Sequence, residues 1–251
     1  MSARIDSLVP DAASALSDDA LLAHYSAGAA VPWLRVNFVS SVDGAATHDG
    51  LSGGLGTEAD HRVFDLLRRL CDVVLVGAGT VRAEGYGPMR VHDAASAWRV
   101  EHGLGAQPVL AIVSGALDLD PASRMFTDAP VRPVVVTLES APAEKRAALA
   151  KVAEVIVAGR DSLDGRALVD EFAARGLGRI HCEGGPHLFG TLLAAGVVDE
   201  LCLTVSPLLE GGESVRIVGG ELPETAALTL AGVLTSESAL LLRYLTSRNS
   251  G

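Results

Sequence analysis

Short apolar runs alternate with longer amphipathic stretches along most of the chain. The apolar runs are nearly continuous and rich in β-branched residues, a pattern typical of parallel strands that are covered on both faces of a sheet. The predicted strands are Leu34–Val39, Val73–Val76, Val109–Val113, Pro133–Thr137, Val155–Val157 and Arg179–Cys182. Because helical patterns lie between these strands, the sequence predicts an α/β fold.

The clearest helical pattern covers Glu58–Leu70, where apolar residues recur at i, i+3, i+4 and i+7 spacing behind Thr57 as the N-cap. Similar apolar faces predict helices over Pro142–Lys151, Leu163–Arg175 and Leu188–Ala195. A glycine follows each of the last two stretches, where a helix C-terminus commonly needs one.

The last fifty residues have a different pattern, with three strand candidates and no convincing helix between them. These candidates are Asp199–Pro207, Ala227–Leu234 and Ala239–Thr246. Such a run predicts antiparallel strands added to the edge of an otherwise parallel sheet. The polar segment Gly85–Gln107 is expected to cross the strand tips.

No repeat or low-complexity linker divides the 251 residues, so we expect a single domain. Its predicted parts are an N-terminal lead-in with a helix (1–32), the α/β domain itself (33–246) and a short tail (247–251). The whole reads as one central, mostly parallel sheet with antiparallel C-terminal edge strands and flanking helices.

Composition narrows the class of protein further. Hydrophobic residues make up 49% of the chain and the formal net charge is −11. An acidic chain without a basic run argues against a nucleic-acid partner, and no apolar run reaches the length of a membrane span. Three widely spaced cysteines indicate buried free thiols in a reducing compartment, and we expect a cytoplasmic protein.

Candidate chemistry lies directly after predicted strands. Gly77, Ala78, Gly79 and Thr80 follow one strand, and Glu183 with Gly184 follows another. Small residues at strand ends let a ligand approach the backbone, and a proline-started helix offers free amides to phosphate. Tight strand-to-helix turns also need glycine, so the first motif alone leaves a structural explanation open.

Asp43 follows a third strand, in the segment from Ser40 to Gly44. An Asp-Gly pair is often only a turn, yet this strand tip would face the same edge as the other two. Asp43 is therefore the candidate for orienting a substrate or relaying a proton. The histidines lack metal-ligand spacing and no GxSxG motif is present, so we expect neither a metal nor a serine nucleophile.

Three segments in this order, VNFVSSVDGAAT, LLRRLCDVVLVGAGTVRAEGYGP and HCEGGPHLFGTLLAAGVVDELCLTVSPLLEGG, resemble the pyrimidine reductase family of riboflavin biosynthesis. The resemblance covers about Trp33 to Arg243 and matches the C-terminal half of the bifunctional deaminase–reductase. It implies a dihydrofolate-reductase-like fold and a stand-alone reductase without the deaminase's zinc motif. The partners it implies are NADPH, a phosphoribosylated aminopyrimidine and a second copy of the chain in a homodimer.

The resemblance also implies site residues. Substrate contacts match Ser52, Arg68, Arg90 and Glu183, and Glu84 stands at a cofactor-contacting aspartate position. The remaining implied cofactor contacts are Val39, Gly54, Thr80 and Ser114 together with Gly185, Pro186, His187, Leu188, Phe189, Gly190 and Thr191.

Two departures from the family pattern lie beside the expected substrate. An acidic pair and proline common in the family are replaced by the segment from Ala83 to Pro88, and Gly54 stands where some members have tryptophan. The reduction of 5-amino-6-(5-phosphoribosylamino)uracil is the expected activity. Two alternatives stay open: reduction of a related heterocycle such as dihydrofolate, and a sensor that binds NADPH without turning it over.

Overall fold

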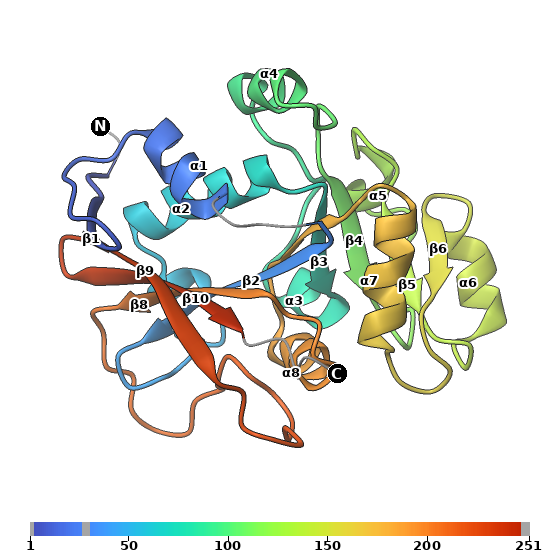
Figure 1. Cartoon of the computed structure of the whole chain (residues 1–251). Coiled ribbons are helices and arrows are strands. Elements are labelled where there is room, and N and C mark those ends of the chain that lie inside the picture. Colours follow the sequence, from blue (N-terminus) through green and yellow to red (C-terminus); the bar gives the residue numbers. More distant parts are fainter. Residues whose placement is uncertain (1–2, 27–30, 247–251) are drawn as a thin grey trace.

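The computed structural model describes residues 3–26 and 31–246, which form one ten-stranded sheet with helices on both faces (Figure 1). The strands are β1 Asp6–Val9, β2 Trp33–Ser41, β3 Val73–Gly77, β4 Val109–Val113, β5 Val134–Thr137, β6 Glu154–Val157, β7 Arg179–Cys182, β8 Glu200–Ser206, β9 Leu228–Ser236 and β10 Ala239–Thr246. The helices are α1 Asp18–Ser26, η1 Gly53–Leu55, α2 Glu58–Leu70, α3 Ala78–Ala83, α4 Asp93–Glu101, α5 Arg124–Thr127, α6 Ala143–Leu149, α7 Gly165–Ala174 and α8 Pro186–Ala194. The tail predicted at 247–251 lies outside the described residues.

The strand order is β1-β9-β10-β8-β2-β7-β3-β4-β5-β6. Neighbouring strands from β8 through β6 are parallel, so their carboxyl ends meet at one edge of the sheet. β10 is antiparallel to both β8 and β9. The mostly parallel α/β sheet with antiparallel C-terminal strands, expected from the apolar pattern, is confirmed.

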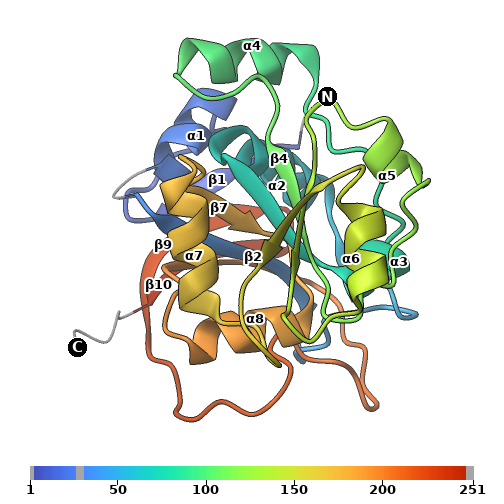
Figure 2. The ribbon, with the colours of Figure 1, turned by 90° about the vertical axis from the view of Figure 1, so that its right-hand side faces the viewer.

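Both faces of the parallel strands are buried, which explains their continuous apolar runs. On one face, alternate residues such as Leu34, Leu75 and Cys182 pack against α7 and α8. On the other, Val74 and Val76 pack toward α3 and α6, while α1 and α2 cover the antiparallel end. Figures 1 and 2 show these helices on opposite sides of the sheet.

Local sequence signals set several helix ends correctly. The Thr57 side chain accepts a hydrogen bond from the Asp60 amide (3.1 Å) and begins α2 at the predicted residue. Gly176 and Gly196 follow α7 and α8 with φ of +75° and +65°, the left-handed conformation that glycine adopts without strain.

The N-terminal lead-in is more closely joined to the sheet than its sequence suggested. The predicted helix is present as α1, but the preceding strand β1 was not expected. β1 pairs antiparallel with β9 and forms one edge of the sheet, with Ile5 fully buried beside it. A four-residue strand is too short to show a clear alternation of apolar and polar residues. β1 forms because its backbone pairs with β9.

The segment Gly85–Gln107 crosses the strand tips only in its first residues. It then runs to the opposite end of the sheet, where α4 lies beyond the amino ends of β3 and β4 (Figure 1). Arg99 holds it there, because the buried guanidinium donates hydrogen bonds to the carbonyl oxygens of Arg68, Arg69 and Cys71 (2.6–3.1 Å). These are the carbonyls left unpaired at the end of α2.

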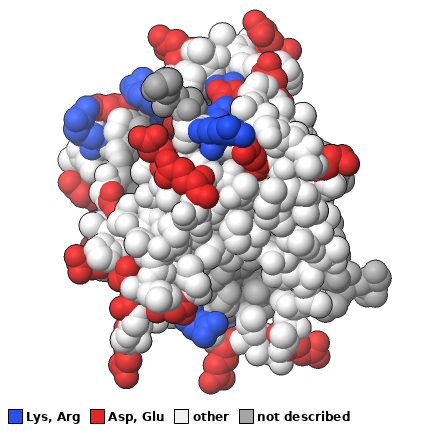
Figure 3. Space-filling view, turned by 90° about the vertical axis from the view of Figure 1, so that its left-hand side faces the viewer, with Lys and Arg blue, Asp and Glu red and all other residues white. Residues whose placement is uncertain are grey.

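Acidic and basic side chains on the face shown in Figure 3 are scattered among uncharged ones, and the lysines and arginines form no continuous patch there. No helix within the described ranges is both long and apolar enough to cross a bilayer. Cys71, Cys182 and Cys202 are buried free thiols, as predicted, and burial raises the pKa of Cys71 and of Cys182 to about 12.

Candidate active site

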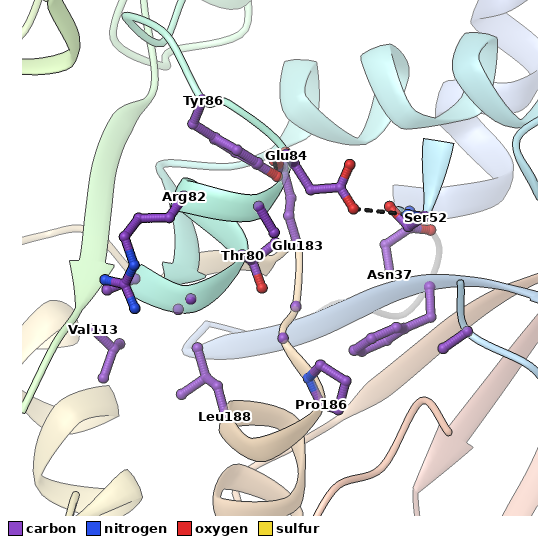
Figure 4. A pocket seen from close by; sticks show the side chains of 18 of the residues that line it. Asn37, Ser52, Thr80, Arg82, Glu84, Tyr86, Val113, Glu183, Pro186 and Leu188 are labelled. Atoms are coloured by element: carbon purple, nitrogen blue, oxygen red, sulfur yellow. Dashed lines mark hydrogen bonds between the residues drawn. The ribbon is translucent and has the colours of Figure 1, made fainter. Parts of the chain in front are cut away.

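A cavity of about 920 Å³ opens at the sheet edge where β2, β3, β4 and β7 end (Figure 4). Its wall includes Val39 from β2, Gly77 from β3, Ser114 after β4 and Glu183 after β7. Ligands of open α/β sheets bind in this position, outside the carboxyl ends of the strands. The sequence expectation that several strand tips share one cleft is therefore confirmed for these residues.

One wall of the cavity is backbone. The Gly77 amide donates to the Gly184 carbonyl oxygen (3.0 Å), which joins the two glycine-bearing strand ends. Gly184 has φ of +102°, and a Cβ on Gly185 would lie only 2.6 Å from Thr80 Oγ1. Thr80 therefore packs directly against the backbone at Gly185, a close approach that a side chain at this position would prevent.

The N-terminus of α8 opens into the same wall. Gly185 is its N-cap, Pro186 occupies the first turn, and the first intrahelical bond runs from the Phe189 amide to the Gly185 carbonyl oxygen. The amides of His187 and Leu188 precede that bond and are available to a ligand. Free amides at a helix N-terminus attract phosphate.

The far end of this wall is polar. Ser114 is the residue directly after β4 and is buried. Its carbonyl oxygen accepts a hydrogen bond from the Thr137 hydroxyl (2.8 Å). Arg82, on α3, extends along the cavity toward Val113, away from Ser52 (Figure 4). Its guanidinium donates to the Asp118 carbonyl oxygen (3.2 Å), so a positive charge stands near Ser114.

The opposite wall holds a buried ion pair. Arg68 donates from Nε to Glu183 Oε1 (2.5 Å) and from Nη2 to Oε2 (2.7 Å), and the Tyr86 hydroxyl donates to Oε2 (2.8 Å). Burial opposes the charged form of Arg68, but the Glu183 carboxylate outweighs it and the pKa of Arg68 is raised. Burial and the same carboxylate raise the pKa of Tyr86. Glu183 is thus a hydrogen-bond acceptor that three donated bonds hold in one orientation.

His181 lies beside this pair in the interior. Its Nε2 is 3.6 Å from Glu183 Oε1, and its ring meets Phe64 edge-on. Neither ring nitrogen has a hydrogen-bond partner among the described residues. Burial, with the positive charges of Arg35 and Arg68, holds the pKa of His181 well below its usual range, so the imidazole is neutral.

Two residues that the resemblance assigns to ligand binding, Ser52 and Glu84, are hydrogen-bonded to each other at the opening of the cavity. The Ser52 amide donates to Glu84 Oε1 (2.8 Å), the bond drawn in Figure 4. Arg90 also lines the cavity, and its Nη2 donates to the Asp128 carbonyl oxygen (2.6 Å) near the surface. Gly54 lies in η1, two residues after Ser52, but packs against His48 and is not among the lining residues.

Asp43 is exposed and its side chain is outside the cavity wall. The carboxylate accepts from the Ser41 hydroxyl and from the amides of Glu210 (3.2 Å) and Gly211 (2.7 Å), which lower its pKa to about 2. Asp43 therefore ties the loop after β8 to the end of β2. Val215, farther along that loop, lines the cavity.

Among the other expected cofactor contacts, Ala78, Gly79 and Thr191 line the cavity, whereas Phe189 and Gly190 do not. Phe189 faces the core and stacks on Phe38 (ring centroids 5.2 Å apart). A Cβ on Gly190 would lie 2.1 Å from the Gly219 carbonyl oxygen, so this glycine permits close packing of the chain.

Several lining residues had no sequence signal of their own. Tyr86, Asp60, Phe64 and Asn37 all line the cavity. The substituted segment from Ala83 to Pro88 pointed toward Tyr86, but nothing distinguished Asp60 or Phe64 from other residues of an amphipathic helix. Among the described residues, no three His, Cys, Asp or Glu side chains are arranged to hold a metal ion.

Comparisons with known proteins show the family of this chain. The sequence profile of the RibD C-terminal domain matches residues 32–242. The chain is 36% identical over 193 residues to the 2,5-diamino-6-ribosylamino-4(3H)-pyrimidinone 5′-phosphate reductase of Methanothermobacter thermautotrophicus, covering 76% of this chain and 85% of that protein. It is 30% identical to the protein of the same name from Archaeoglobus fulgidus, over 76% of this chain and 87% of that one.

Solved structures give the same result. A pyrimidine reductase-like protein from Corynebacterium diphtheriae superimposes with a TM-score of 0.79 at 30% identity, over 87% of this chain and 93% of that one. A riboflavin biosynthesis reductase from Saccharomyces cerevisiae shares the fold at 17% identity, with a TM-score of 0.66 over 91% and 97% of the two chains.

This chain belongs to the RibD C-terminal domain family. The resemblance to the riboflavin-pathway pyrimidine reductases is confirmed, and with it the single α/β domain with a mostly parallel central sheet. The relatives at 36% and 30% identity carry the name of a reductase acting on a phosphorylated ribosylaminopyrimidinone.

Proposed function

We propose that this protein is an NADPH-dependent reductase that converts the ribosyl group of a phosphoribosylated aminopyrimidine into a ribityl group in riboflavin biosynthesis. The observation that carries the proposal is the cavity itself, in which a glycine-lined groove faces the buried Glu183–Arg68 pair. A groove that admits an extended cofactor beside an oriented acceptor for a heterocycle suits a reductase. The names of the relatives support the same activity.

The residues present fit a dinucleotide. Gly185 and Thr80 both line the cavity where a side chain at residue 185 would collide with Thr80, and the His187 and Leu188 amides suit a pyrophosphate. Ser114 and the Arg82 guanidinium would hold a 2′-phosphate, which is why we expect NADPH rather than NADH. When bound, NADPH supplies a hydride to the sugar carbon C1′.

On the substrate side, Glu183 would accept hydrogen bonds from amino or ring N–H groups of the pyrimidine. Arg68 and Tyr86 hold that carboxylate in one orientation. Ser52 and Arg90 lie at the mouth and would hold the 5′-phosphate, for which a guanidinium offers a planar pair of donors. The chain's task is to bind, orient and shield the reacting carbon.

The stand-alone relatives favour the 2,5-diaminopyrimidinone over 5-amino-6-(5-phosphoribosylamino)uracil as substrate, because their names specify the former. The two compounds differ at C2, which carries an amino group in the first and an oxygen in the second. A carboxylate acceptor such as Glu183 favours the amino group.

The test compares both pyrimidines and dihydrofolate in parallel, with NADPH and NADH each supplied. We expect the diaminopyrimidinone with NADPH to give the highest kcat/KM. Turnover of dihydrofolate alone would assign the protein to a folate-type reductase, and NADPH binding without turnover of any substrate would identify a sensor. The homodimer, the cytoplasmic location and the division at residues 32 and 246 stay predictions.

A further inference from the structure

A fourth carboxyl group in the cavity has no place in the function proposed so far. Asp60 lies in the first turn of α2, lines the cavity and is only 8% exposed. Its carboxylate lies against Gly56, where an added Cβ would be 3.4 Å from Asp60 Oδ2. The same Cβ would lie 2.7 Å from His61 Nε2, so the Asp60 carboxyl group and the His61 ring both border Gly56, and all three residues line the cavity.

Each of the other carboxylates of the cavity wall has an ion-pair partner or a backbone amide as its donor. Glu183 is paired with Arg68, Asp118 is paired with Lys145, and Glu84 accepts from the Ser52 amide. Asp60 takes part in none of the ion pairs formed within residues 3–26 and 31–246. A buried carboxyl group without a cation favours its protonated form.

The partner of Asp60 places it beside the end of β2, where a cofactor contact is expected. Its carboxyl group is hydrogen-bonded to the Thr204 hydroxyl, and Thr204 stands opposite Val39 in the pairing of β8 with β2. Val39 is an expected cofactor contact at the end of β2. Asn37, two residues earlier on that strand, also lines the cavity.

Few groups influence the pKa of the Asp60 carboxyl. Burial raises the pKa of Asp60, while the Thr204 hydroxyl and the neighbouring His61 lower it. The net direction is upward. In contrast, hydrogen bonds from Ser41, Gly211 and Glu210 lower the pKa of Asp43 to about 2, so that group is ionised near neutral pH.

We propose that Asp60 is the catalytic proton donor of the reduction. This role rests on the proposed function. The sugar ring opens by breaking C1′–O4′, and the proton of the exocyclic amine passes to O4′, which gives a C1′=N imine. C1′ then gains a hydride and its electron pair from the nicotinamide, which is oxidised. The C=N π electrons move to nitrogen, which takes the Asp60 proton, and the Asp60 carboxylate is reprotonated from water.

The experiment compares Asp60→Asn with Asp65→Asn, an exposed aspartate on the same helix that does not line the cavity. The asparagine introduced by D60N keeps the size of the side chain and the hydrogen bond to Thr204 but has no acidic proton. We expect kcat to fall at least about 100-fold in D60N, the usual contribution of a general acid. NADPH affinity and thermal stability should change little, and D65N should match the wild type.

Two further measurements do not depend on turnover. In 13C-labelled protein without ligands, the carboxyl resonance lost in D60N should titrate above the ordinary aspartate pKa of about 3.9. Thr204→Val removes the hydroxyl that favours the ionised form, so this pKa should rise further. The alkaline limb of kcat against pH should move up with it, which a purely structural role would not produce.

The outcomes separate the two proposals. A D60N variant that keeps kcat within about threefold of an active wild type, or an Asp60 resonance that titrates below about 3.9, overturns the role of Asp60 and leaves the reductase standing. A wild type that binds NADPH but reduces neither pyrimidine overturns the proposed function and this role with it.

Discussion

Arg68 and Glu183, 115 positions apart in the sequence, form a two-bond ion pair whose carboxylate is fully buried in the cavity wall. The arginine comes from α2 on one face of the sheet, and the glutamate follows β7 in its middle. Arg68 also packs over the Phe64 ring, 4.3 Å from its centroid. The pair therefore joins a helix to the sheet at the point where we expect the pyrimidine to bind.

Arg68→Lys should weaken both folding and substrate binding, because an ammonium group cannot form the paired bonds of a guanidinium. We expect the free energy of unfolding in urea to fall by about 1–2 kcal/mol, and KM for the pyrimidine to rise. Arg69→Lys is the matched control. Arg69 rests on Trp98 outside the cavity, and its change should stay within about 0.5 kcal/mol. Equal effects in both variants would contradict a special role for Arg68.

Gly185→Val should abolish NADPH binding while the protein still folds. The added Cβ would lie 2.6 Å from Thr80 Oγ1, and the rest of the side chain would occupy the groove. NADPH fluorescence titration measures the affinity, and circular dichroism checks the fold. Gly79→Ala, with nothing within 4 Å of the new Cβ, is the control for folding. A folded G185V protein of unchanged affinity would place the cofactor elsewhere.

Asp43→Asn separates two roles for this residue. The sequence favours a catalytic carboxyl, whereas the geometry favours an anchor for the loop that carries Val215. An asparagine amide would face the Glu210 and Gly211 amides as a second donor and loosen the loop. We therefore expect KM to rise severalfold and kcat to stay within about threefold. A tenfold loss of kcat at unchanged KM would restore the catalytic role.

The loop after β8 should loosen as pH rises through the pKa of His48. His48 Nδ1 lies 3.0 Å from both carboxylate oxygens of Glu210, whose hydrogen bond and charge raise the pKa of His48. A raised pKa means that this contact stabilises the fold below the ordinary value of about 6.5 and is lost above the folded-state value. The hydrogen-exchange protection factors of residues 207–219, which correct for the base-catalysed intrinsic rate, should be lower at pH 9 than at pH 6, and His48→Gln should remove this difference.

His181→Leu should stabilise the protein by about 1 kcal/mol, because it removes two buried nitrogens that lack partners among the described residues. In the folded wild type His181 stays neutral, because its pKa lies well below the value in the unfolded chain. The unfolded chain therefore binds one more proton as pH falls below about 6.5, and the free energy of unfolding decreases. Urea unfolding at pH 5 and 8 should show a smaller loss in H181L than in the wild type. A destabilised variant with an unchanged pH dependence would refute this account.

Much of the fold was predictable because it depends on local patterns. Apolar runs gave the parallel strands, and Thr57 gave the first residue of α2. β1 was missed because a four-residue edge strand depends on its partner β9 rather than on its own sequence. The path of α4 was missed for a similar reason, since Arg99 holds it through carbonyl groups distant in sequence.

The site was predictable where its chemistry leaves a mark on the backbone. The motifs directly after strands pointed to Gly77, Glu183 and Gly185, and the family resemblance added Arg68. Asp60 left no such mark, because a polar residue on an amphipathic helix has the same pattern whether it faces water or a cavity. Only the packing of α2 over β8 distinguishes it.

The position of β2 has a consequence for how the chain is made. β2 is complete by Ser41, yet its neighbours in the sheet are β7 and β8, which end at Cys182 and Ser206. A nascent chain must therefore carry an unpaired apolar strand until most of the protein has left the ribosome. Such long-range pairing folds slowly and exposes strand edges. Synthesis rate and chaperone supply should thus limit the yield of this protein more than its final stability does.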